Sequence, residues 1–146
     1  MKRISLRILV AIVLPLMCVL FVIGYACSNG KTGTGAVLAQ EFKIKYGQEL
    51  TVEGQDLKVK FASVLDDSRC PANVTCIWEG FAKIVIGVRR AKAEESQMEL
   101  HTHDRFTRAG KYQQYVIRLV ALDPYPRTDV ERKLSDYVAT LLITKE

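Results

Sequence analysis

The chain has 146 residues, of which 49% are apolar and 25% charged, and its formal net charge is +5. This length and composition suit one globular domain with a hydrophobic core. Basic residues are concentrated at the N-terminus, because from residue 28 onward 18 Lys and Arg face 16 Asp and Glu. The body is therefore almost neutral. It also has no basic stripe interleaved with aromatic side chains, so we do not expect it to bind nucleic acid.

The N-terminal segment has the pattern of an export signal. Lys2, Arg3 and Arg7 precede an uncharged apolar run over residues 8–23. A basic segment followed by such a run predicts a signal peptide or a membrane anchor over residues 1–27. The sequence therefore predicts an extracytoplasmic body in the bacterial cell envelope that meets the membrane through its N-terminus.

Three alternatives for the end of this segment stay open. In the first alternative Cys27, which follows Ala26, is lipidated, as in a lipoprotein. In the second a signal peptidase cuts after Ala26 or after Ala39. In the third alternative the run stays as an uncleaved anchor, although about 16 to 20 residues are near the lower limit of a bilayer span. The Gly-, Ser- and Thr-rich start of residues 28–40 predicts a flexible linker and favours a tether.

From residue 41 onward apolar and polar residues alternate, which is the period of a β-strand. The alternation is found in seven segments, which are residues 41–46, 48–53, 56–65, 81–90, 96–103, 113–122 and 136–145. A helical turn fits residues 128–135, where Thr128 and Glu131 resemble a capping box. We predict an all-β domain over residues 41–146, either an antiparallel β-sandwich or a partly closed barrel of about seven strands.

The body contains two cysteines, Cys70 and Cys76, with five residues between them. In an exported protein this pattern predicts one disulfide. A redox pair usually has two intervening residues, and a structural zinc site needs four ligands, so both alternatives are weaker. Closing so short a loop contributes about 2 to 2.5 kcal/mol, and its main effect is to fix one loop.

The segment DSRCPANVTCIWEG holds both cysteines and the only tryptophan, Trp78. Together with Ala82 it resembles a D-S-R-C-P-x4-C-x-W-x-G pattern of an uncharacterised family of small exported bacterial envelope proteins and lipoproteins. The later segments YVIRLVALDPYP and DYVATLLI look like the closing strands of the same proteins, so the resemblance covers roughly residues 42–144. It implies a β-rich envelope protein and brings no activity.

Side chains around the cysteine loop have a structural and a functional interpretation. Trp78 is expected to bury its ring on the disulfide at the edge of the core, and Gly80 to leave room for that ring or for a bulge. Arg69 is expected to pair with a neighbouring carboxylate, namely Asp66, Asp67 or Glu79. In the functional alternative, Arg69, Trp78 and Glu79 form a rim that binds a partner.

His101 and His103 are weak candidates for metal ligands. Residues i and i+2 of a strand share one face about 6 to 7 Å apart, with Glu99 or Asp104 nearby. A third ligand is not identified, so we expect an exposed polar strand face, no metal site and no cofactor. The sequence has two histidines and no GxSxG, P-loop, GxGxxG or HExxH motif, so we expect a protein that is not an enzyme.

These patterns predict a membrane-tethered extracytoplasmic binding module, with an envelope protein as the candidate partner and a ligand that the sequence does not identify. Its most distinctive surface is the cysteine loop, since loops at the ends of a β-sandwich meet partners. The alternative is an inhibitor of an exported hydrolase that presents this rigid loop with Arg69. Burial of both Arg69 and Trp78 would weaken the inhibitor hypothesis.

Overall fold

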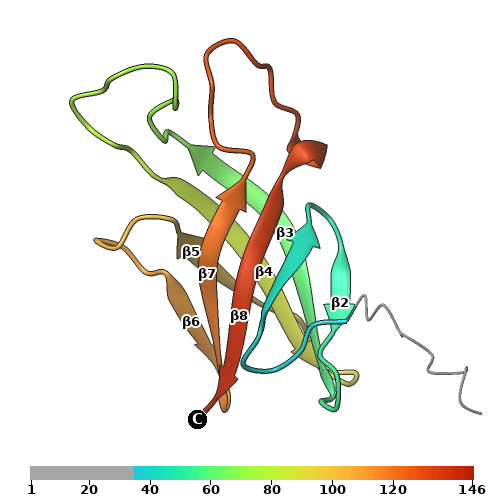
Figure 1. Cartoon of the computed structure of the whole chain (residues 1–146). Helices are drawn as coiled ribbons and strands as arrows, with labels where there is room; N and C mark the ends of the chain where they lie inside the picture. Colours follow the sequence, from blue (N-terminus) through green and yellow to red (C-terminus); the bar gives the residue numbers. More distant parts are fainter. Residues whose placement is uncertain (1–34) are drawn as a thin grey trace, which may run out of the picture. The chain divides into compact units, whose positions relative to one another are not determined.

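The computed structural model describes residues 35–146 (Figure 1). The predicted signal or anchor over residues 1–27 and the first part of the predicted linker lie outside the described residues. The described chain forms two four-stranded antiparallel sheets, ordered β1-β8-β7-β6 and β2-β3-β4-β5. The strands are β1 (Glu41–Lys45), β2 (Glu49–Thr51), β3 (Leu57–Asp67), β4 (Ala82–Arg90), β5 (Ser96–His101), β6 (Ala109–Tyr112), β7 (Tyr115–Asp123) and β8 (Val138–Lys145).

The predicted all-β sandwich is confirmed, with eight strands instead of about seven. The missed strand is β6, which pairs with β7 from Ala109 opposite Arg118 to Tyr112 opposite Tyr115. Its sequence, AGKY, has one large apolar residue and no alternation, so the period-two signal is absent. Backbone pairing with β7 supports this edge strand.

The inward side chains are those that the alternation predicts, and they form one core between the sheets. Fully buried members are Ile44, Leu57, Val59, Phe61, Ile84, Ile86, Leu100, Ile117, Leu119, Leu141 and Ile143. Tyr115 is also fully buried, and its hydroxyl donates a hydrogen bond to Gln55 Oε1 at 2.7 Å. Each large side chain contributes about 1.5 to 3 kcal/mol on burial, so this core accounts for most of the stabilisation.

The domain begins earlier than the predicted boundary at residue 41. Ala36 is fully buried and forms a parallel bridge with Val52, and Leu38 packs against the core. The backbone N–H of Ala39 donates to the carbonyl of Ile143 at 2.8 Å. Residues 36–40, predicted as linker, are therefore part of the packed domain, because the apolar Ala-Val-Leu sequence inside them has core surface to cover.

The two ends of the sandwich differ. At the end that we call apical, β3 and β7 finish and β4 and β8 start, since Asp67 pairs with Ala82 and Asp123 with Val138. The connections over residues 68–81 and 124–137 lie at this end (Figure 1) and are joined by a hydrogen bond from Thr128 to Asn73, and the connection over residues 102–108 contacts the first of them through His103 and Trp78. We call the opposite end basal. Val52 lies beside Leu57, the first residue of β3, so the described chain starts at the basal end.

The predicted helical turn is shorter than expected and lies later in the chain. Only a 3-10 helix, Leu134–Asp136, occurs in this connection, and the backbone N–H of Lys133 donates to Asp136 Oδ2 at 2.9 Å. Thr128 makes no capping box with Glu131. Its backbone N–H instead donates to Asn73 Oδ1 at 3.0 Å, in another apical connection. A contact between distant segments therefore replaces the local one.

Gly80 is required for a reason other than room for a tryptophan ring. Its φ is +65°, and a Cβ there would lie 1.9 Å from the carbonyl oxygen of Ser68. Any side chain at position 80 would therefore push apart the two segments of the β3–β4 connection that contain Ser68 and Gly80.

We predict that Gly80→Ala lowers the free energy of unfolding by about 2 to 4 kcal/mol, because it adds a steric clash to left-handed strain. The matched control is Gly54→Ala, where φ is +69° and no atom lies within 4 Å of the added Cβ. That control should lose only about 1 kcal/mol. Urea titrations measure both values, and equal losses would contradict the close approach of Ser68.

Candidate functional site

One buried carboxylate joins the apical connections. Asp67, the last residue of β3, has a side chain that is 6% exposed. Arg69 donates to it twice, from Nε to Oδ1 at 2.7 Å and from Nη2 to Oδ2 at 2.9 Å. The Tyr137 hydroxyl donates to Oδ2 at 2.8 Å, and Arg132 Nη1 donates to the same oxygen. Asp67 therefore ties its own strand to the connection between β7 and β8.

The environment of Asp67 favours its charged form. Burial acts to raise the pKa of the Asp67 carboxyl, but hydrogen bonds from Arg69 and Tyr137 and the charges of Arg69 and Arg132 outweigh it. The net result is a pKa below the ordinary value. The pKa of Tyr137 is raised, first by burial and then by its hydrogen bond to Asp67. Both groups keep their hydrogen-bonding protonation states at neutral pH.

Arg69 is buried, being 7% exposed. Besides Asp67, its guanidinium donates from Nη1 to the carbonyl of Leu122 at 2.6 Å and from Nη2 to that of Pro124 at 3.0 Å. It also lies 5.0 Å from the ring centroid of Tyr125. The expected pairing with a neighbouring carboxylate is thus to Asp67. The position of Arg69 gives no support to the hypothesis that it reaches a partner, because its donors are used within the domain.

The predicted disulfide between Cys70 and Cys76 is confirmed, with Cα atoms 6.0 Å apart. The backbone N–H of Cys70 also donates to the carbonyl of Glu79 at 2.8 Å, which closes the loop at its base. A disulfide of this kind indicates an oxidising, extracytoplasmic location.

Side-chain and backbone hydrogen bonds hold the cysteine loop against the β7–β8 connection. Asn73 Nδ2 donates to Thr128 Oγ1 at 2.6 Å, and the backbone of Thr128 donates back to Asn73 Oδ1. The backbone N–H of Ala72 donates to the carbonyl of Pro126 at 2.9 Å. Two long connections are thus fixed to one another, so their exposed side chains have defined positions.

Trp78 does not have the predicted buried position on the disulfide, since 47% of it is exposed. Its ring stacks on the imidazole of His103, with centroids 5.6 Å apart and an interplanar angle of 21°. The guanidinium of Arg105 lies 5.7 Å from the same ring. The β5–β6 connection therefore replaces the disulfide as its support. Ile77, beside it, is fully exposed.

The two histidines separate instead of sharing a strand face. β5 ends at His101, whose ring contacts Phe81 and Phe106. His103 accepts a hydrogen bond at Nδ1 from the backbone N–H of Arg105 at 3.0 Å, and its Nε2 faces Glu79. Within residues 35–146, no group of three or more His, Cys, Asp or Glu gathers to hold a metal ion. The expectation that these histidines bind no metal stays a prediction.

Exposed large apolar side chains gather at the apical end. They are Leu65, Val74, Ile77, Trp78, Phe106, Tyr125, Val130 and Leu134. All eight lie in the three apical connections or near the end of β3, and no other large apolar residue of the described chain is as exposed. We call these eight residues the apical apolar set. Sequence analysis identified only Trp78, because an isolated apolar residue in a polar loop has no periodic signal.

A pocket of about 290 Å³ lies among the apical connections. We call it the apical pocket, and the residues that matter in its lining are Arg69, Glu79, Thr102, His103, Asp123 and Tyr125. It brings together His103 with Arg69 and Glu79, which the sequence placed beside the cysteine loop. The Thr102 hydroxyl accepts a hydrogen bond from the backbone of Ala82 at 2.8 Å, and the His103 ring is engaged at both nitrogens. The arrangement therefore offers fixed polar groups suited to binding.

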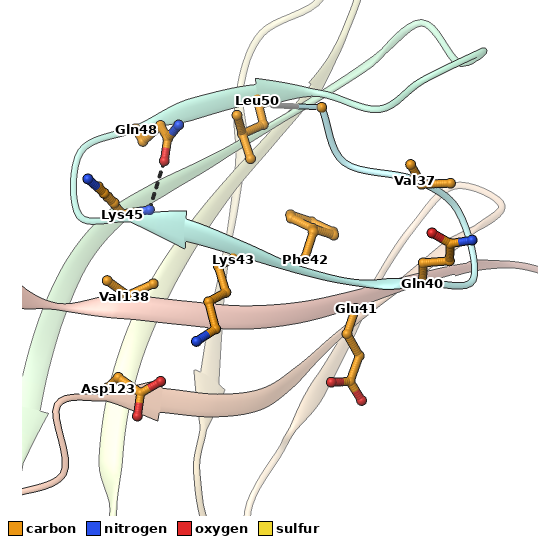
Figure 2. A pocket seen from close by; sticks show the side chains of 11 residues that line it. Val37, Gln40, Glu41, Phe42, Lys43, Lys45, Gln48, Leu50, Asp123 and Val138 are labelled. Carbon is orange, nitrogen blue, oxygen red and sulfur yellow. Dashed lines mark hydrogen bonds between the residues drawn. The ribbon is translucent and has the colours of Figure 1, made fainter. Parts of the chain in front are cut away.

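A larger groove of about 930 Å³ lies along β1 (Figure 2). Phe42 and Leu50 point into the space between β1 and β2, whereas Glu41 and Lys43 lie on the other side of β1 (Figure 2). This groove contains none of the predicted site residues. The apical pocket, which contains Arg69, Glu79 and His103, is therefore the better candidate.

No known protein-family model matches the chain, and comparisons with curated proteins and with solved structures find no match. The resemblance to exported envelope proteins stays a prediction, and the functional argument depends on geometry. Across residues 35–146, no helix is long and apolar enough to span a bilayer.

We predict that Asp67→Asn lowers the free energy of unfolding at pH 7 by about 3 kcal/mol, because it leaves the buried Arg69 and the partly buried Arg132 without their carboxylate. The folded pKa of Asp67 is below its unfolded value. The stabilisation is therefore complete above about pH 4 and is lost as the pH falls through the folded pKa.

Denaturant titrations from pH 7 downward measure this dependence. The variant should show a flatter acid limb than the parent chain. The control is Asp129→Asn, which removes an exposed partner of Arg127 and should leave the free energy of unfolding almost unchanged. Parallel acid limbs in the parent and Asp67→Asn would exclude this role.

Proposed function

We propose that the protein is a membrane-tethered extracytoplasmic binding module that docks a partner through its apical end. The observation that carries this proposal is that the apical apolar set lies in the three apical connections and near the end of β3. Exposed apolar groups concentrated on one region typically mark an interaction site. Trp and Tyr are also the residues that most often supply binding energy at interfaces, and Trp78 and Tyr125 belong to the set.

The rigidity of the apical end supports the same function. The Cys70–Cys76 disulfide, the Asp67 contacts and the Asn73–Thr128 hydrogen bonds fix the connections before any partner arrives. Ordering a loop on binding costs conformational entropy, and a loop that is already ordered avoids most of that cost. A fixed apolar surface therefore binds more tightly than a mobile one of equal area.

The position of the N-terminal side of the domain is consistent with a tether. Ala36 lies at the basal end, beside Val52. A lipid on Cys27, followed by the predicted linker, would join the domain at this end. β3 has 11 residues and runs between the two ends, so it separates them by about 35 Å. A domain tethered in this way presents the apical apolar set to soluble or neighbouring partners, away from its own anchor.

Inhibition of an exported hydrolase is the second candidate. Arg69 no longer favours it, because its guanidinium is buried and paired with Asp67. One observation still does: Ile77 is fully exposed immediately after Cys76, in a loop closed by a disulfide. The contacts of an inhibitor would then centre on Ile77 in an enzyme pocket for an apolar side chain.

We predict that the full chain carrying a photoreactive residue at position 77 forms a discrete cross-linked adduct in intact cells, whereas one at Lys92, in the basal β4–β5 turn, does not. Trp78→Ala should remove the adduct at position 77. It should cost only about 1 kcal/mol of stability, because the ring is half exposed. Equal adducts from both positions, or none from either, would contradict docking through the apical end.

We also predict that the chain incorporates a labelled fatty acid through Cys27. Cys27→Ser should abolish the label, because the thiol is the only group at that position that accepts a lipid. Fractionation of membranes measures the consequence. Retention of an unlabelled parent chain in the membrane would instead show an uncleaved anchor, and its release would show signal-peptidase cleavage.

A further inference from the structure

The outer strands of the two sheets are not covered equally. At β5 and β6 the sheets approach each other, since the backbone N–H of His101 donates to the carbonyl of Thr107 at 2.9 Å. A Cβ on Gly110 of β6 would lie 2.5 Å from the sulfur of Met98 in β5. At the other ends of the sheets, β1 and β2 are separated by the groove of about 930 Å³ (Figure 2). β1 has five residues and β2 three, so β1 is the longer open edge.

The backbone of β1 bonds to β8 on one side only. The N–H of Tyr46, directly after β1, donates to the carbonyl of Tyr137 at 2.9 Å, in the register of the β1–β8 pair. Hydrogen-bonded residues alternate along an antiparallel strand, so the even-numbered residues of β1 bond to β8. The N–H and C=O groups of Glu41, Lys43 and Lys45 therefore point away from β8, toward the groove.

The next turn of the chain closes one end of this edge. Gln48 Oε1 accepts from the backbone N–H of Lys45 at 2.9 Å, and the backbone N–H of Gln48 donates to the carbonyl of Lys45 at 2.9 Å. Within residues 35–146, no hydrogen bond reaches the outward backbone groups of Glu41 or Lys43. These two residues therefore offer donors and acceptors to one further strand.

The charges of β1 favour a second copy of β1 as that strand. Three antiparallel registers of two copies use the backbone groups of Glu41 or Lys43. Two of them place Glu41 opposite the partner's Glu41 or Lys43 opposite the partner's Lys43, and like charges directly opposite are destabilising. The third places Glu41 opposite the partner's Lys43, and the two-fold symmetry repeats this favourable pair.

The apolar residue between them fits the same register. Phe42 then lies opposite the partner's Phe42 in a non-hydrogen-bonded pair, where side chains come closest. Phe42 and Leu50 point into the space between β1 and β2 (Figure 2), so the paired rings extend the apolar core of each copy. A lysine on an edge strand discourages pairing with other chains, and Lys43 finds an opposite charge in this one register.

We propose that two copies of this chain associate through β1, antiparallel about Phe42, with Glu41 opposite the partner's Lys43. The β1-β8-β7-β6 sheets of the two copies then form one continuous sheet. The contact is shorter than a standard interface, so we expect a dissociation constant on the order of tens of micromolar. The apical ends stay uncovered at opposite ends of the dimer, so this inference does not depend on apical docking.

Oxidative cross-linking of the full chain in detergent tests the pairing. Phe42→Cys places the thiols of two copies directly opposite, with Cα atoms about 4.5 Å apart, which suits a disulfide. We expect a covalent dimer from this variant. The matched control is Thr51→Cys, an exposed position of the other open edge, β2, which should give no more dimer than the parent chain.

Charge exchange tests the register. In the Phe42→Cys chain, Lys43→Glu should weaken association roughly tenfold, because Glu41 then faces a second carboxylate. Glu41→Lys should weaken it to a similar extent. The combined Glu41→Lys and Lys43→Glu substitutions should restore association, since opposite charges face each other again. Sedimentation equilibrium of the same charge variants with Phe42 in place should give the same order, whether or not Phe42→Cys folds.

Three results would overturn the inference: a folded Phe42→Cys chain that yields no dimer, equal dimer from Thr51→Cys, or a combined charge exchange that fails to restore association. A parent chain that remains monomeric in sedimentation at about 100 µM would also overturn it. Cross-linking at position 77 concerns a different surface, so each of these results leaves the test of apical docking unaffected.

Discussion

The buried carboxylate of Asp67 is the contact on which the apical end depends. Asp67 is the last residue of β3. Its carboxylate accepts hydrogen bonds from Arg69, Arg132 and Tyr137, which lie in two different connections. A carboxylate in this position is costly to bury unless strong donors surround it, and here three side chains do so. Arg132 and Tyr137 lie more than 60 residues from Asp67 along the chain. The charge of Asp67 therefore fixes the relative position of the two sheets at the end where their strands stop pairing.

Arg69 and Arg108 also cover the exposed edge of β7 at the apical end. β6 is short and leaves the last residues of β7 without a neighbour on that side. Arg108 Nη2 donates to the carbonyl of Val120 at 2.9 Å, and Arg69 donates to those of Leu122 and Pro124. Unpaired strand edges invite pairing with other chains, and capping their carbonyls with cations prevents this. The exposed apolar residues of the apical end therefore lie next to a protected edge.

Sequence reasoning predicts local features well and long-range contacts poorly, for physical reasons. Alternation locates Phe61, Ile84 and Leu119 in the core, because side chains of a strand alternate between faces whatever the partner strand is. The Cys70–Cys76 bond follows from the short spacing and the export signal. The stack of Trp78 on His103 joins residues from different connections, and no local pattern specifies how two loops meet.

The same limit explains the other differences. Asp67 and Arg69 are neighbours, so their pairing was expected, but Arg132 and Tyr137 lie far along the chain. β6 lacks the apolar alternation of a buried strand and gains its structure from β7. Residues 36–38 are apolar but follow a polar stretch and are too few to show an alternating pattern, so their burial depends on the surface that they cover.

At the apical end, the side chains that hold the connections together are different from those that are exposed. Asp67 and Arg69 are buried and Asn73 bonds to Thr128, and these residues hold the connections, whereas Ile77, Trp78 and Phe106 are exposed and hold nothing in the core. The exposed members can therefore be exchanged for other residues without loosening the frame. A domain organised in this way is suited to engineering, because its exposed residues can be varied while the frame that positions them is kept.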